Sequence, residues 1–138
     1  MGLKNSQQVI IENLEKEKSC FESLALKLKQ QKIAIKNQNE EQVLQIIEEK
    51  NILIKNFKKF EKNIENQLQL LSPEDIKSLL KQGETLKESI ENLLGEIILS
   101  EEECEKEISS KMQEVEKKII GLQKGKNITK GYRGYQKI

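Results

Sequence analysis

The chain has 138 residues, with 24 Lys or Arg against 23 Asp or Glu, no histidine and one proline. Charged residues make up 34% of the chain and aromatic residues 4%. With periodic Ile and Leu this composition is typical of helical bundles and coiled coils, whereas a disordered chain would lack the apolar stripes. The length fits one domain.

The sequence has few residues suited to catalysis or metal binding. Histidine, the usual acid–base residue near neutral pH, is absent. Cys20 and Cys104 are isolated at helical core positions, which predicts neither a disulfide framework nor a metal site, and without a histidine base neither fits a thiol nucleophile. We therefore expect no enzyme, no cofactor and no metal.

The sequence also bears on the compartment of the protein. The first residues have no apolar core of a signal peptide, and no apolar run is long enough to span a bilayer. Two unpaired cysteines fit a reducing environment. These features predict a cytoplasmic protein without a membrane span.

A first helix is expected over residues 6–36, with Ser6 as its N-cap. Its apolar residues recur at alternating steps of four and three, which is coiled-coil spacing. Glu17 and Gln31 interrupt this seam, and we expect them near helix ends or open sides where water is available. The seam reads Ile10, Leu14, Glu17, Phe21, Leu24, Leu28, Gln31, Ile35.

The polar break Asn37-Gln38-Asn39 separates this helix from a second one, expected over residues 40–70 with Asn39 as its N-cap. The second helix has a wide apolar stripe, which suits a helix that touches two neighbours. Because the connection is short, the two helices should be antiparallel.

The segment Ser72-Pro73-Glu74-Asp75 predicts the start of a third helix, since serine caps, proline suits the first turn and acids follow. Apolar periodicity continues to Leu122, and Gly121 and Gly125 should end the helix. A helix over 73–122 is about 75 Å long, against about 45 Å for each earlier helix. The expected fold is all-α: an elongated antiparallel three-helix bundle or coiled coil, with residues 1–123 as one helical domain.

The unequal lengths leave the residues after about Glu103 without a partner helix. This overhang keeps an apolar stripe, which we expect to capture a helix of another protein through anchors at helical spacing. The alternatives are that the stripe belongs to the chain's own core or is covered in a homodimer. The candidate partner-binding residues are Cys104, Ile108, Met112, Val115, Ile119 and Leu122.

Residues 124–138 form a basic tail that we expect to be flexible. It has five basic residues and no acid, following an acid-rich stretch over 91–107, which is typical of an interaction tail. Tyr132 and Tyr135 lie between lysine and arginine, so they could stack on bases or anchor a protein interface. The pattern does not choose between these two uses.

Taken together, these features resemble the FlgN-type flagellar export chaperones. The resemblance covers nearly the whole chain. It lies in the amphipathic first helix, in the stretch 39–51 where a capped helix start leads into a Glu-Lys pair, and in the long last helix that ends in a glycine-containing tail with tyrosine. The sister chaperones of the filament cap, the FliT type, look much alike at this level.

The resemblance implies a cytosolic, ATP-independent chaperone. Such a protein binds the C-terminal amphipathic helix of hook–filament junction proteins, prevents their premature assembly and aids delivery to the export apparatus. In the family the C-terminal helical region binds the substrate, which here falls on the overhang. Two other classes stay open: a self-associating structural coiled coil, and a nucleic-acid binder that uses the basic tail.

Overall fold

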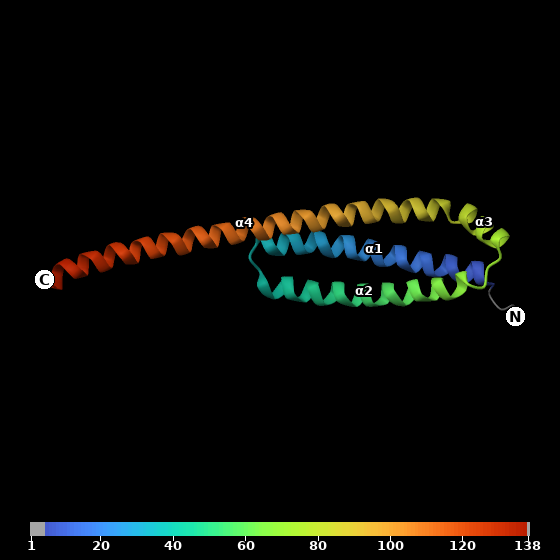
Figure 1. The fold of residues 1–138 in the computed structure, drawn as a ribbon, viewed down its shortest axis with the longest axis horizontal. Helices are drawn as coiled ribbons and strands as arrows, with labels where there is room; N and C mark the ends of the chain where they lie inside the picture. The colour runs from blue at the N-terminus through green and yellow to red at the C-terminus, as the bar shows by residue number, and fades with distance from the viewer. Residues whose placement is uncertain (1–4, 138) are drawn as a thin grey trace. The chain divides into compact units, whose positions relative to one another are not determined.

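The structure is a computed structural model that describes residues 5–137, and the side chains of residues 5–125. Four helices account for nearly all of the described chain, which contains no strand: α1 (Ser6–Lys36), α2 (Glu40–Leu68), α3 (Pro73–Gln82) and α4 (Glu84–Lys137) (Figure 1). The predicted all-α class is therefore confirmed. The chain divides into two compact units, an N-terminal unit of residues 1–104 and a C-terminal unit of residues 105–138, whereas the sequence predicted one domain over 1–123.

α1 begins at Ser6 as predicted, but its N-cap is one residue earlier than expected. Asn5, and not Ser6, is the N-cap: its side chain accepts a hydrogen bond from the backbone N–H of Gln8 at 2.8 Å. The Gln8 side chain in turn accepts from the backbone N–H of Asn5 at 3.3 Å. This reciprocal capping box satisfies two N–H groups that have no partner within the helix. With Ser6 as the cap, Gln8 would no longer be the third residue after the cap and could not complete the box.

The polar break between α1 and α2 is a compact helix stop. Gln38 has φ 56°, the left-handed conformation. Its N–H donates to Ile35 O at 3.0 Å, and the N–H of Asn39 donates to Ala34 O at 2.9 Å. These two bonds are the Schellman pattern that closes a helix C-terminus. Asn39 then caps α2 by accepting from the N–H of Gln42, as predicted.

The predicted helix over 73–122 is two helices. Ser72 caps α3 and Pro73 opens it, as expected, but α3 ends at Gln82. The following residue, Gly83, is buried, and a Cβ there would lie 3.1 Å from the carbonyl oxygen of Leu79 and 3.8 Å from Cδ1 of Ile11. A side chain at position 83 would thus crowd the backbone of α3 itself and would reach Ile11 of α1 at ordinary van der Waals distance. Apolar periodicity does not reveal such crowding, because residues on both sides keep helical spacing.

The end of α4 also lies beyond the predicted one. The helix continues to Lys137, so Gly121 and Gly125 do not end it. A glycine inside a helix costs only about 1 kcal/mol, and a glycine stop requires the left-handed conformation, which no described glycine adopts. The predicted flexibility of residues 124–138 is not tested, because the side chains after residue 125 lie outside the described part.

The core of the N-terminal unit joins α1 to the first part of α4 and to α2. Leu28 of α1 is fully buried, beside Ile97 and Cys104 of α4. Phe21 of α1 meets Phe57 of α2 with ring centroids 5.0 Å apart. In this unit α1 therefore has neighbours on two sides (Figure 1), and its buried face is correspondingly wide.

Polar contacts give the register of these helices. Asn63, late in α2, donates to Asn13, early in α1, at 3.2 Å. Lys50, in the first half of α2, donates to Gln31, late in α1, at 3.0 Å. The end of one helix thus meets the beginning of the other.

Candidate functional site

The C-terminal unit carries a row of exposed apolar side chains on α4, spaced by four and three residues. This spacing places them on one face of the helix. Between 42% and 67% of each side chain is exposed, so each retains apolar area that a partner could cover. We call this row the apolar stripe: Ile108, Met112, Val115, Ile119 and Leu122.

Cys104, the sixth predicted partner-binding residue, is not part of this surface. It is 2% exposed in the core of the N-terminal unit, and its thiol donates to the carbonyl oxygen of Leu28 at 3.6 Å. Burial raises the pKa of the Cys104 thiol, since the thiolate would lose its hydration. Cys104 is therefore covered by the chain itself, because α1 still extends beside α4 at this residue.

The remaining predicted residues, Tyr132 and Tyr135, lie outside the part of the chain whose side chains the structure describes. Sequence reasoning also missed one residue of the C-terminal unit. Ile120 is 48% exposed next to the apolar stripe. The sequence signal for it was the adjacent pair Ile119-Ile120, because two neighbouring apolar residues widen the apolar face of a helix.

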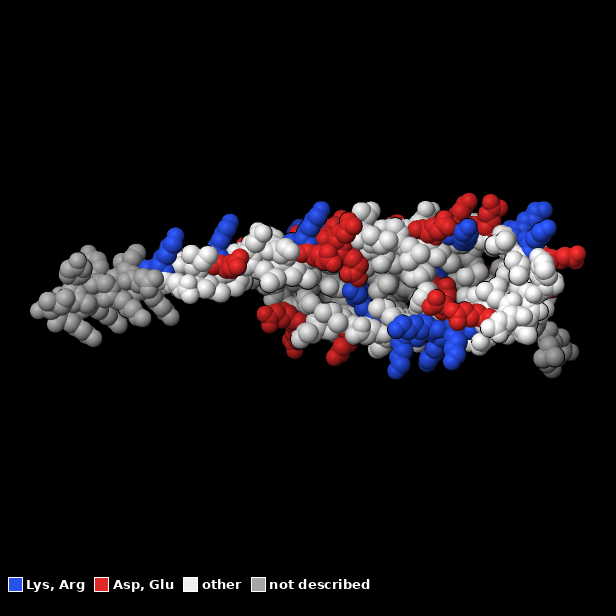
Figure 2. All heavy atoms as spheres, in the orientation of Figure 1, with Lys and Arg blue, Asp and Glu red and all other residues white. Residues whose placement is uncertain are grey.

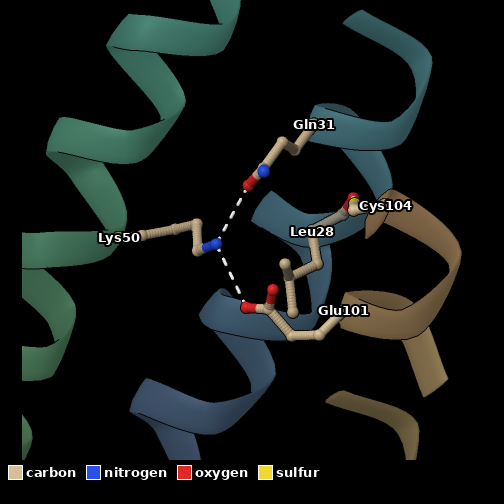
Figure 3. Close-up of polar contacts among 5 residues, drawn as sticks. All are labelled: Leu28, Gln31, Lys50, Glu101 and Cys104. Carbon is tan, nitrogen blue, oxygen red and sulfur yellow. Dashed lines mark hydrogen bonds and ion pairs between the residues drawn. The ribbon is translucent and has the colours of Figure 1, made fainter. Parts of the chain in front are cut away.

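A buried polar group joins three helices of the N-terminal unit (Figure 3). Lys50 of α2 points between α1 and α4, where its ammonium donates to Gln31 at 3.0 Å and to Glu101 at 3.1 Å. Gln31 is 6% exposed, so the expectation that it faces water is wrong. A buried amide is tolerated when its polar atoms are paired, and Lys50 supplies that partner from another helix.

Glu17 is the other seam residue expected near water, and it is buried at 7% exposure. Burial, and secondarily the negative charge of Glu61 on α2, raise the pKa of Glu17 from 4.5 to about 7. Both effects penalise the ionised carboxylate. Near neutral pH the α1–α2 contact therefore holds a carboxyl group that is partly protonated. The neighbouring thiol, Cys20, has a raised pKa through burial and the proximity of Glu17.

The outer surface of the N-terminal unit is mixed in charge. Figure 2 shows separate groups of acidic and of basic side chains on the face drawn, with no single sign dominating. A shallow groove of about 620 Å³ lies between α1 and α2, next to Cys20, Leu53 and Phe60. The ammonium of Lys16 lies 5.7 Å from the centre of the Phe60 ring. A cation therefore already covers one face of the largest apolar side chain that lines this groove.

The part of the chain that the structure describes contains no group of three or more His, Cys, Asp or Glu residues that could hold a metal ion. The described residues also contain no helix that is both long and apolar enough to cross a membrane.

Comparison with known proteins gave no relative: no family model, no curated protein and no solved structure matches this chain. The candidate site therefore depends on geometry alone. An exposed row of large aliphatic side chains on a helix can bury apolar area against another helix, and methionine lets such a surface adapt to its partner.

Proposed function

We propose that this protein is a cytosolic chaperone of flagellar type III export. It would bind the C-terminal amphipathic helix of a hook–filament junction protein, prevent premature assembly and aid delivery to the export apparatus. The role is one of binding, without catalysis. The exposure of the apolar stripe on α4 is the single observation that carries the proposal.

The size of the stripe fits such a role. Complete burial of a large aliphatic side chain contributes about 1.5–3 kcal/mol. The stripe has five such side chains, and about half of each is exposed and can still be buried. Burying this remaining area contributes roughly 5 kcal/mol from this side of the interface, with a similar contribution from the bound helix. Ordering and association costs offset much of this sum. A reversible complex is the expected result, which suits a protein that must release its substrate.

The N-terminal unit supplies a scaffold in this proposal. We propose that α1, α2 and the first part of α4 act as an antiparallel three-helix bundle, which is supported by the contacts Asn13–Asn63 and Gln31–Lys50 and by the core around Leu28. Its core includes no residue of the apolar stripe. Changes in the stripe should therefore affect binding without unfolding the bundle.

The test uses Ile119→Asp in the full chain, with Gln113→Asp as the matched control. Both positions are exposed on the same helix, but residue 113 lies off the stripe. Titration calorimetry would measure binding of a peptide from the C-terminal helix of a hook–filament junction protein. We expect Ile119→Asp to weaken binding at least about 100-fold, because it removes apolar contact and places a charge in the interface.

Thermal unfolding of the same variants distinguishes binding from stability. We expect both to melt within about 2 °C of the parent, as is usual for exposed positions. A large fall in melting temperature for Ile119→Asp would place Ile119 in the core and contradict the proposal. So would equal binding by both variants. A peptide from a filament-cap protein, measured in parallel, distinguishes the FliT-type substrate.

A further inference from the structure

The apolar stripe follows the a and d positions of a heptad repeat. With Met112 and Ile119 at a, the d positions are Ile108, Val115 and Leu122. Knobs-into-holes packing requires this alternation of four and three. Ile119 at a followed by Leu122 at d is the combination that favours two parallel strands over three or four.

The charged residues beside the stripe show which orientation a second copy would take. In this register Lys111 and Lys118 occupy g, and Glu116 occupies the e position between them. In a parallel pair, Lys111 of each copy would face Glu116 of the other, because g contacts the e position five residues on. In an antiparallel pair, g contacts g, so that Lys111 would face Lys118 and charges of like sign would repel.

The ends of the stripe limit the length of the pairing. On the N-terminal side the next a position is Glu105, and on the C-terminal side the sequence puts Lys126 at a. Charged residues at a weaken a coiled-coil seam. The apolar seam thus spans two heptads and lies wholly within the C-terminal unit. Helical pairings this short are marginally stable, which predicts a reversible dimer.

We propose that a second copy of this chain covers the apolar stripe in the free protein, in a parallel, in-register, two-stranded coiled coil over residues 108–122. Charge complementarity between Lys111 and Glu116 selects this occupant and this orientation. Lys111 pairs with Glu114 of its own helix at 3.5 Å. Such a partly exposed pair can be replaced by an interchain pair at small cost. The dimer goes beyond the proposed chaperone function and does not depend on it.

Disulfide trapping tests the orientation in the full chain. In the parallel register, residue 122 of one copy lies beside residue 122 of the other copy. In an antiparallel pair, residue 122 lies near residue 108 of the other copy. Leu122→Cys should therefore form a covalent dimer on mild oxidation. Gln113→Cys, exposed at an outer b position, is the matched control, and the parent chain controls for Cys20 and Cys104. Equal cross-linking of the two variants, or none in either, overturns the proposal.

Charge reversal tests the pairing by sedimentation of the free protein over a range of concentrations. We expect the parent to show a concentration-dependent dimer. Lys111→Glu should weaken it about tenfold, because two attractive contacts become repulsive. The double variant Lys111→Glu/Glu116→Lys should restore it, although it lacks the intrachain contact with Glu114. A parent that stays monomeric at every concentration, or a double variant no better than the single one, refutes the dimer.

These measurements separate the dimer from the chaperone proposal. A monomeric parent that still binds the substrate peptide through Ile119 would remove only the dimer. A dimeric parent that binds no substrate peptide would remove only the chaperone function.

Discussion

Replacing Glu17 by glutamine should stabilise the protein at alkaline pH and leave its stability almost unchanged at pH values below 4.5. Glu17 is buried between α1 and α2, where loss of hydration and the nearby charge of Glu61 raise its pKa from 4.5 to about 7. Between these two pH values the folded chain holds a proton on Glu17 that the unfolded chain has released. The free energy of unfolding therefore falls as pH rises through this window.

The magnitude follows from the two pKa values. A change from 4.5 to about 7 corresponds to about 3 kcal/mol lost once the pH is above both values. Glutamine has nearly the same shape and stays neutral, so Glu17→Gln should recover most of this loss. For a cooperative unit of this size, that equals a rise of about 10 °C in melting temperature.

Thermal unfolding by circular dichroism at about pH 4, below both pKa values, and at about pH 8.5, above both, measures the effect. The parent and Glu17→Gln should melt together at the lower pH and separate at the higher one. Glu61→Gln should give a smaller part of the same gain, since that charge is the lesser cause. Glu15→Gln, exposed on the same helix, is the matched control. If the difference in melting temperature between the parent and Glu17→Gln is the same at both pH values, Glu17 is hydrated in the folded chain, and the burial argument is refuted.

Three further changes test the N-terminal unit by thermal unfolding or thiol reactivity. Lys50→Ala should lower stability by about 1–3 kcal/mol, because a buried acceptor loses its partner; no loss would mean that water replaces the ammonium. Gly95→Ala should raise stability by about 1 kcal/mol, since it adds helix propensity in open space. Gly83→Ala should bring no such gain, because its Cβ would crowd a backbone oxygen at 3.1 Å. Equal effects of the two substitutions would contradict this crowding. Alkylation of the folded protein should modify Cys20 before Cys104, which is 2% exposed, and the reverse order would exclude the assigned core.

Local signals in the sequence determined the helices of the N-terminal half. Asn39 and Ser72 cap helices as predicted, and the bounds of α1 match because cap and stop are formed by neighbouring residues. The spacing of the apolar stripe was also readable, since helical periodicity alone puts Ile108 to Leu122 on one face. These features depend on residues within a few positions of one another.

Tertiary structure alone decided which polar residues are buried and where the long helix breaks. Glu17 and Gln31 looked like interruptions that need water, yet both are buried, and α2 supplies Lys50 to Gln31. Gly83 looked like a weak point within one helix, but it is buried beside Ile11 of α1, where α3 ends. Likewise Cys104 has the spacing of the stripe, although α1 buries it. Each outcome depends on residues distant in sequence, because burial and close approach are properties of helix pairs that no single helix pattern contains.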